Sequence, residues 1–349
     1  MRCDAPAAGR LRPLRPSGRG RRLVLVLALV ALAAGTGCDR RPETRASRPS
    51  PASTHSTAMA PGDHLDPPAL ADLPAAGSAA GVPVLCYHYF RGRFAPGYAL
   101  RVLGSVLLGL PALGPREFWT TPVAEFERHL RHFRDAGYIV TTLDDVADLV
   151  TSGRAVPAKA VILTIDDADR SVYEQAYPLL GKYGMRAHLF VPTSHVGQAW
   201  SGLHVCTEAQ LKEMAASGTI LLESHTHDLH YKEMSGGKAV PVFLQPELIA
   251  ADRRTDDDSR PGHRWAPVAR DLATSRDAIR RLGGDRAPWL AWPYGFANAA
   301  LDSLSRDLGF RGTVSLSPRP FGPADRALRV GRFALTANTT LAKVEALTP

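Results

Sequence analysis

Residues 160–167 read Ala-Val-Ile-Leu-Thr-Ile-Asp-Asp, a short and largely apolar run that ends in two adjacent carboxylates. A run of this length before polar residues predicts a buried β-strand. Two carboxylates at the end of a buried strand are costly unless something uses them. Because side chains alternate along a strand, Asp166 and Asp167 should point in different directions. One can then bind a cation while the other faces a substrate, although a solvated turn is the better explanation of the pair when it is taken alone.

Similar apolar runs alternate with amphipathic segments on both sides of this strand. Strands are expected at residues 82–88, 138–142, 160–165, 187–191, 219–223, 289–292 and 312–316. Helices are expected from residue 122, where Thr121 would be the N-cap and Pro122 the first helical residue, and at 143–150, 172–183, 207–216, 266–282 and 298–308. Residues 235–264 are polar and predict a loop. This alternation predicts an α/β fold, with a parallel sheet covered on both sides and about seven units, which is enough to close a barrel. Catalytic groups should then follow the carboxyl ends of the strands.

Two further strand ends carry polar residues. The strand at 219–223 is followed by Ser224-His225-Thr-His227-Asp-Leu-His230, which places three histidines within six residues. A lone histidine is usually structural, but three histidines together with an acidic pair on another strand end predict a metal site, because histidine is the commonest neutral ligand of zinc. The strand at 289–292 is followed by Pro293-Tyr294-Gly295, whose backbone could offer an N–H to a developing oxyanion, although the tripeptide is also an ordinary turn signal.

The positive charge of the chain is concentrated at its N-terminus. Residues 1–38 hold seven arginines and one acid, and so account for +6 of the formal net charge of +8. A nucleic-acid-binding protein would carry that charge in its folded part, so we expect no nucleic-acid partner. Residues 23–34 form an apolar run after Arg21-Arg22, too short for a comfortable membrane span and typical of an export signal.

Small residues before Cys38 resemble a bacterial lipobox, in which Cys38 would be lipidated and become the mature N-terminus. Gly35 stands where that motif prefers Leu, and simple cleavage or an uncleaved anchor are the alternatives. Residues 1–38 are therefore expected to be a signal segment, residues 39–81, rich in Pro, Ala, Ser and Thr, a flexible linker, and residues 82–349 the folded domain. The resulting expectation is an exported, membrane-anchored lipoprotein that faces the periplasm or the cell exterior.

Two features of the folded part stay open. Cys86 lies in an apolar strand pattern that predicts a buried free thiol, with one disulfide between Cys86 and Cys206 as the alternative. Residues 91–118 are an apolar insertion that is compatible with a lid, a membrane-facing hairpin or a segment packed on the core. The sequence gives no indication of the oligomeric state.

Three motifs, in this order, resemble those of the polysaccharide deacetylases, the NodB-like proteins of carbohydrate esterase family 4. Residues 164–173 with Ala176, Pro178 and Leu179 are similar to the first motif, residues 224–230 to the second, and Trp292-Pro293-Tyr294-Gly295 to the third. The resemblance covers about residues 82–345. It implies a distorted (β/α)7-type barrel, a bound divalent metal, usually zinc, and an N-acetylated polysaccharide as substrate.

Within that family the chain is most similar to bacterial deacetylases of poly-β-1,6-N-acetylglucosamine. In that group the second histidine ligand follows the first by five residues, as His230 follows His225, and an N-terminal histidine such as His88 replaces a C-terminal catalytic one. The resemblance implies that Asp167, His225 and His230 hold the metal. It also implies three catalytic groups: Asp166 as general base, His88 as general acid, and the Tyr294 backbone as an oxyanion donor.

Three positions depart from the family pattern. Ala168 replaces the usual Gly, so a positive φ there would strain the turn by about 1 kcal/mol. Asp169 stands where an aromatic residue is common. Ala291 replaces an Arg that lies beside the base in many relatives, so the pKa of Asp166 is expected to be set by the metal and by local hydrogen bonds. The rival interpretations are the same chemistry on peptidoglycan or chitin, and a non-catalytic carbohydrate-binding relative.

Overall fold

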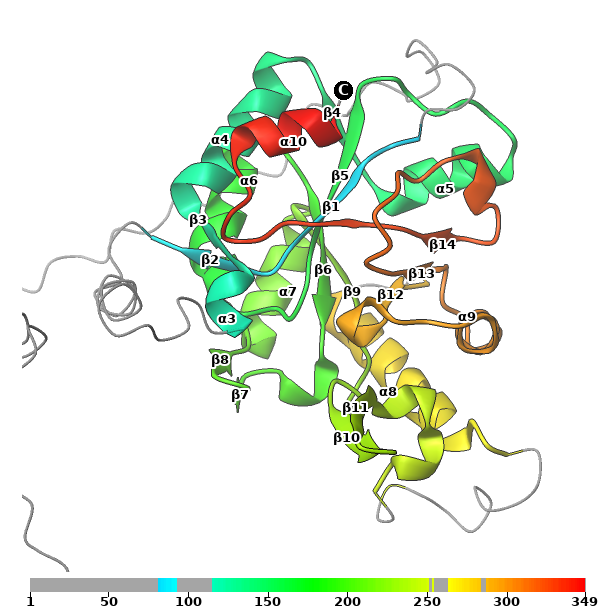
Figure 1. Cartoon of the computed structure of the whole chain (residues 1–349). Helices are drawn as coiled ribbons and strands as arrows, with labels where there is room; N and C mark the ends of the chain where they lie inside the picture. The colour runs from blue at the N-terminus through cyan, green and yellow to red at the C-terminus, as the bar shows by residue number, and fades with distance from the viewer. Residues whose placement is uncertain (1–80, 93–114, 251–252, 254–262, 284–286, 349) are drawn as a thin grey trace, which may run out of the picture. The chain divides into compact units, whose positions relative to one another are not determined.

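The computed structural model describes residues 81–92, 115–250, 253, 263–283 and 287–348 (Figure 1). The proposed signal segment with Cys38, nearly all of the linker and most of the apolar insertion lie outside these residues. None of the helices within them combines the length and the apolarity that a membrane crossing requires.

A sheet of nine strands forms the centre of the domain, and every strand pair in it is parallel. Its order is β14-β13-β12-β9-β6-β5-β1-β15, with β4 paired to β5. The strands are β1 (Val84–Tyr87), β4 (Ile139–Thr141), β5 (Ala160–Ile165), β6 (Ala187–Val191), β9 (Ile220–Ser224), β12 (Leu290–Ala291), β13 (Thr313–Val314), β14 (Arg329–Val330) and β15 (Phe333–Ala334). All six residues of β5 are buried, as expected for a strand covered on both faces.

The sheet curls into a distorted, incompletely closed (β/α) barrel. Strands β14 and β15 end the strand order and, among the described residues, are not paired with each other. They are nevertheless almost consecutive in the chain, since only Gly331 and Arg332 separate them. This two-residue connection therefore crosses the seam of the barrel, where a Cβ on Gly331 would lie 2.4 Å from the Ser317 carbonyl oxygen.

Helices surround the sheet (Figure 1). They are α3 (Pro115–Phe118), α4 (Val123–Asp135), α5 (Leu143–Thr151), α6 (Tyr177–Lys182), α7 (Glu208–Ala216), α8 (Ala266–Gly283), α9 (Ala299–Asp307) and α10 (Leu341–Leu347). Thr142 and Thr207 begin α5 and α7 with capping boxes, in which the side chains of Asp145 and Gln210 bond back to the capping residues. Thr207 is the cap expected from the sequence.

Three details differ from the sequence-based expectations. Helix α4 begins at Val123 and not at Pro122, because Thr120–Pro122 is drawn into a short strand, β3, that pairs with β2 (Tyr89–Arg91). The expected helix at 172–183 is a π-helical turn, Val172–Ala176, followed by α6. The expected loop at 235–264 begins instead within a hairpin, β10 (Lys232–Ser235) and β11 (Lys238–Pro241). Gly236 and Gly237 both have positive φ there, which is the two-residue turn that a Gly-Gly pair favours.

A second, small hairpin pairs β7 (Ala199–Trp200) with β8 (Leu203–His204), near the carboxyl end of β6. The apolar side chains of β1, β5 and β6 contribute to the main core with α4, α6 and α7. The carboxyl ends of β1, β5, β9 and β12 thereby carry His88, Asp166-Asp167, His225 and Pro293 to the same edge of the sheet, as parallel strands require.

Candidate active site

Asp167, His225 and His230 form one cluster at this edge. The Nε2 atoms of His225 and His230 lie 3.4 and 3.5 Å from Oδ1 of Asp167, and one ligand atom from each residue lies within 4.8 Å of the others. Two ligands bound to one ion at about 2.1 Å with a tetrahedral angle would lie about 3.4 Å apart. The spacing of the cluster therefore fits a small divalent cation.

Hydrogen bonds prepare these groups for that use. The backbone carbonyl of Ala291 lies 2.8 Å from Nδ1 of His225, which places the ring proton on Nδ1 and leaves the Nε2 lone pair directed at the cluster. The Tyr89 hydroxyl donates to Oδ2 of Asp167 at 2.5 Å. Oδ1 of Asp167 is buried and makes no hydrogen bond to any described residue. A buried carboxylate oxygen without a donor is costly, and a cation at the cluster would satisfy it.

The burial of His230 also suits a metal ligand. Burial is the main cause that lowers the pKa of His230 to about 4, so its ring is neutral at pH 7. Trp200 meets the ring edge-on, with centroids 4.9 Å apart, and Tyr294 packs at 4.7 Å. A neutral imidazole held between aromatic rings can coordinate a metal through Nε2. With three protein ligands the site would keep an open position, which is the arrangement of catalytic zinc sites.

His227, the third histidine of the motif, points elsewhere. Its Nδ1 lies 3.0 Å from the Thr193 hydroxyl, and its backbone N–H donates to the Asp271 carboxylate. Asp271, on α8, also accepts the Asp228 N–H, both at 2.8 Å. These two bonds hold the loop that carries His225 and His230. Sequence reasoning missed Asp271 because it lies more than forty residues after the loop, within an amphipathic helix.

Asp166 has a partner that the sequence did not indicate. The guanidinium of Arg332 donates two parallel hydrogen bonds, NH1 to Oδ1 at 2.7 Å and NH2 to Oδ2 at 2.8 Å. Burial by itself would raise the pKa of Asp166, but the charge and hydrogen bonds of Arg332 outweigh it and lower the pKa to about 2. Local hydrogen bonds thus contribute to this pKa, as expected, but the charge of a buried arginine contributes as well and was not expected. The arginine that is missing at position 291 is supplied from the seam between β14 and β15.

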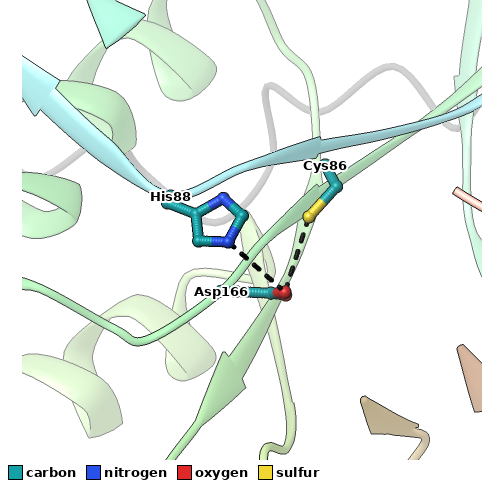
Figure 2. Close-up of side chains that lie close together, drawn as sticks. All are labelled: Cys86, His88 and Asp166. Atoms are coloured by element: carbon teal, nitrogen blue, oxygen red, sulfur yellow. Dashed lines mark hydrogen bonds and ion pairs between the residues drawn. The ribbon is translucent and has the colours of Figure 1, made fainter. Parts of the chain in front are cut away.

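His88 approaches the same carboxylate from the end of β1 (Figure 2). Its Nε2 lies 3.9 Å from Oδ2 of Asp166, and Trp119 packs against the ring with centroids 4.4 Å apart. Burial lowers the pKa of His88, and this effect outweighs the opposing influence of the two aspartates. Nδ1 of His88 has no hydrogen-bond partner among the described residues. The geometry thus joins a charged carboxylate and an imidazole that gives up its proton readily.

The turn after β5 is strained. Asp167 and Ala168 have φ values of 69° and 49°, in the left-handed region that favours glycine. Position 168 therefore does adopt the positive φ that favours glycine. Ala168 is fully buried in the main core, so contacts of its methyl group offset part of this strain.

The third motif forms a tight turn, Pro293–Gly295, beside His230. Tyr294 has a φ of 60°, and Gly295 has a φ of 75° with Leu316 so close that a Cβ would lie 2.6 Å away. Both the backbone conformation and this approach require glycine at 295. The turn places the Tyr294 ring against His230 of the cluster.

Other side chains singled out in the sequence have structural roles. Tyr87, Trp289 and Trp292 are fully buried, which excludes their stacking on sugar rings. Their polar atoms face His129, Asp144 and Asp302 respectively. Cys86 and Cys206 are buried free thiols and form no disulfide with each other.

Comparisons with known proteins agree with these features. Residues 153–313 match the family model described as polysaccharide deacetylase. YxkH of Bacillus subtilis, which carries a polysaccharide deacetylase name, is 32% identical over 178 residues, 51% of this chain and 52% of that protein. A poly-beta-1,6-N-acetyl-D-glucosamine N-deacetylase of Staphylococcus aureus is 25% identical over 214 residues, 61% of this chain and 67% of that protein. The matched region thus spans about half the length of the B. subtilis relative.

Solved structures extend the likeness to most of the folded domain. IcaB from Ammonifex degensii is 29% identical with a TM-score of 0.58, over 78% of this chain and 98% of that one. The BpsB deacetylase domain from Bordetella bronchiseptica is 26% identical with a TM-score of 0.53, over 76% of this chain and 98% of that one.

Proposed function

We propose, from the premise that this chain carries a polysaccharide deacetylase domain, that it removes N-acetyl groups from an N-acetylglucosamine polymer with the help of a divalent metal ion. One observation carries the proposal. The cluster of Asp167, His225 and His230, in which Oδ1 of Asp167 has no hydrogen-bond partner among the described residues, lies next to a separate carboxylate–imidazole pair. That pair is Asp166 and His88. Deacetylation needs both: a site that polarises the acetamide, and groups that move protons on either side of it.

Asp167, His225 and His230 would hold the ion. A zinc or similar divalent ion in such a site supplies a Lewis acid and lowers the pKa of a bound water towards about 7. The protein groups set its orientation, because Ala291 fixes the ring of His225 and Tyr89 fixes the carboxylate of Asp167. Such supporting contacts typically change metal affinity or activity by about 10–100-fold when they are removed.

Asp166 would accept the proton of the attacking water. Arg332 keeps its carboxylate ionised at neutral pH and fixes its plane with two hydrogen bonds. A carboxylate whose pKa is about 2 is a weak base, so it would carry the proton only in passing, towards the leaving group. A carboxylate offers about four lone-pair sites, and Arg332 uses two of them, which leaves Oδ2 able to accept a proton.

His88 would donate the proton to the departing amine. Its Nε2 lies 3.9 Å from Oδ2 of Asp166, so both groups reach the same part of the site. Because burial lowers its pKa, the ring gives up a proton more readily than an exposed histidine. The Tyr294 N–H, presented by the tight turn at 293–295, would stabilise the oxyanion of the acetamide.

Poly-β-1,6-N-acetylglucosamine is the polymer we propose. Its support is the name of the S. aureus relative, together with the five-residue spacing of His225 and His230 and the N-terminal position of His88. Peptidoglycan and chitin carry the same acetamide, so the choice among them depends on how the polymer lies across the site.

The test is acetate release by the purified protein from poly-β-1,6-N-acetylglucosamine, chitin oligomers and peptidoglycan. We expect release from the first, its loss after chelation, and its return with zinc. Asp166→Asn with metal bound is the matched inactive control. Release from chitin or peptidoglycan alone would transfer the activity to that polymer. Tight binding of a glycan without any acetate release by metal-loaded protein would identify a carbohydrate-binding protein.

We further propose that Cys38 is lipidated and anchors the protein to a bacterial membrane, so that residues 39–81 tether the domain. The support is the apolar run 23–34 and the small residues before Cys38. Cys38→Ser should release the protein into the soluble fraction or block its processing. Wild-type protein that is already soluble, and cleaved elsewhere, would contradict the anchor.

A further inference from the structure

A second group of ligand-type side chains lies beside the proposed metal cluster. Cys86, on β1, directs its sulfur to Oδ2 of Asp166 at 3.5 Å, and His88 faces the same oxygen (Figure 2). The sulfur, the imidazole nitrogen and the carboxylate oxygen all lie within 4.8 Å of one another, and all three residues are buried. The proposed function uses His88 and Asp166 but gives the thiol no role.

Arg332 makes this group a poor site for a hard dication. Its guanidinium is fully buried and already neutralises Asp166 through two hydrogen bonds. A dication would add uncompensated positive charge next to a buried arginine, which is strongly unfavourable in a medium of low dielectric constant. Within the part of the chain that the structure describes, Asp167 pairs with His225 and His230 and with no arginine or lysine, and this separates the two groups electrostatically.

A soft monovalent cation avoids that penalty. When such an ion replaces the proton of the Cys86 thiol, the buried net charge does not change. Thiolate sulfur is the ligand that selects soft ions such as Cu⁺, and imidazole nitrogen is a good companion ligand. With the bond lengths of zinc as a guide, about 2.3 Å to sulfur and 2.0 Å to nitrogen, the two ligands span about 4.3 Å when they are collinear. The sulfur–nitrogen separation, at most 4.8 Å, therefore needs little adjustment.

We propose that Cys86, His88 and Asp166 form an inhibitory site for a soft monovalent cation of the Cu⁺ or Ag⁺ type. Cys86 and His88 are the main ligands, and Oδ2 of Asp166 is a weaker third one. In the binding step the S–H bond breaks, a sulfur–metal bond forms, and the proton leaves to solvent, with no change of oxidation state. The inhibition rests on the proposed roles of His88 and Asp166, since the ion would occupy the acid and mask the base. The binding itself does not rest on them.

The experiment uses Ag⁺, which avoids redox chemistry, in chloride-free buffer. The protein is the full chain with Cys3→Ser and Cys38→Ser, loaded with zinc, so that Cys86 and Cys206 are its remaining thiols. Bound silver and zinc are measured by elemental analysis after gel filtration, together with proton release and thiolate-to-metal absorbance. Acetate release is followed in parallel.

We expect one tightly bound Ag⁺ per chain, one proton released, zinc retained and deacetylation stopped. Cys86→Ala should lose the tight equivalent, and the matched control Cys206→Ala, another buried thiol, should keep it. His88→Ala should weaken binding by at least about 10-fold, as the loss of a ligand does. If Cys86→Ala does not fold, Cys86→Ser, of nearly the same size, replaces it, with circular dichroism as the check.

Three outcomes would overturn the site. They are unchanged silver binding in the Cys86 variant, loss of binding in the Cys206 variant, and zinc released one for one with silver. Silver stoichiometry is read without any substrate, so a protein that binds Ag⁺ as expected but never releases acetate would disprove the deacetylase proposal and leave the site in place.

Discussion

Asp166 and Asp167 are neighbours at the end of one strand, yet their carboxylates have opposite surroundings. Asp167 faces the imidazoles of His225 and His230 and keeps one oxygen without a hydrogen-bond partner among the described residues. Asp166 is neutralised by Arg332 through two hydrogen bonds. The first arrangement invites a cation and the second excludes a hard one. A single peptide step therefore separates the proposed metal ligand from the proposed proton acceptor, because each carboxylate meets a different part of the fold.

Replacing Asp167 should have the largest effect on metal binding and on acetate release. In Asp167→Asn we expect metal affinity to fall by more than the ~10–100-fold typical of supporting residues, because the charged ligand itself is lost. Acetate release should fall with it and return in part at high zinc concentration. Metal titration by calorimetry measures the change. Unaltered affinity in this variant would remove Asp167 from the metal site.

Replacing Asp166 should leave metal binding unchanged. Asp166→Asn should retain zinc and lose deacetylation by about 10²–10⁴-fold, the usual contribution of a general base. The variant leaves Arg332 buried without its counter-charge, which typically costs about 3–5 kcal/mol of stability. Asp166→Asn combined with Arg332→Met is the control for folding and should regain part of that stability in a urea titration. Loss of zinc from a folded Asp166→Asn protein would merge the two roles that the geometry separates.

Substitutions of His88 test whether the pair of His88 and Asp166 contains a proton donor as well as a proton acceptor. We expect His88→Ala to fold, bind zinc and lose about 10²–10⁴-fold in rate. His88→Gln keeps polarity without titration and should be equally impaired. Near-normal acetate release by His88→Ala would reassign the proton donor and would weaken the case for the poly-β-1,6-N-acetylglucosamine branch.

A substitution of Asp271 tests how the loop that carries His225 and His230 is held, and its effect should be smaller. In Asp271→Asn one side-chain NH₂ would oppose a backbone N–H of the His227–Asp228 loop, so zinc affinity should fall by about 10–100-fold. Burial is the main cause that raises the pKa of Asp271 to about 7, against an unfolded value near 3.9. A raised carboxyl pKa favours the fold at low pH, and that contribution is lost as pH rises through about 7. Urea titrations from pH 4 to 8 should show this slope in wild type and not in Asp271→Asn, and parallel slopes would disprove it.

Ala168, next to Asp167, should show the smallest effects. Ala168→Gly relieves roughly 1–2 kcal/mol of left-handed strain. It also loses about 0.8 kcal/mol of methyl burial and adds about 0.4–1 kcal/mol of unfolded-state entropy. Stability should therefore change by less than about 1 kcal/mol. Ala168→Val should destabilise clearly, because a β-branched residue tolerates a positive φ poorly. Thermal unfolding measures both, and a strongly stabilised glycine variant would mean that the turn stores more strain than its conformation indicates.

Much of the architecture could be read from local patterns. Strands β5 and β6 have the expected bounds, and Thr207 caps α7 as expected, because a short apolar run and a capping residue act on their own neighbours. The β10–β11 hairpin was missed although Gly236-Gly237 signalled its turn. The expected helix 172–183 contains a π-helical turn that apolar periodicity does not reveal.

The features of the site also divide into those that local sequence determines and those that the tertiary structure determines. The sequence by itself determined that Asp166, Asp167, His88 and the histidine motif would meet, because parallel strands bring their carboxyl ends to one edge. The pairing of Arg332 with Asp166 was determined by the tertiary structure alone. Arg332 lies in a two-residue connection across the seam of the barrel, 166 residues from the carboxylate that it binds. Two adjacent aspartates are equivalent in a sequence. Asp166 is paired with a buried arginine, whereas Asp167 keeps an oxygen without a hydrogen-bond partner among the described residues. This difference depends on where distant segments of the chain fold.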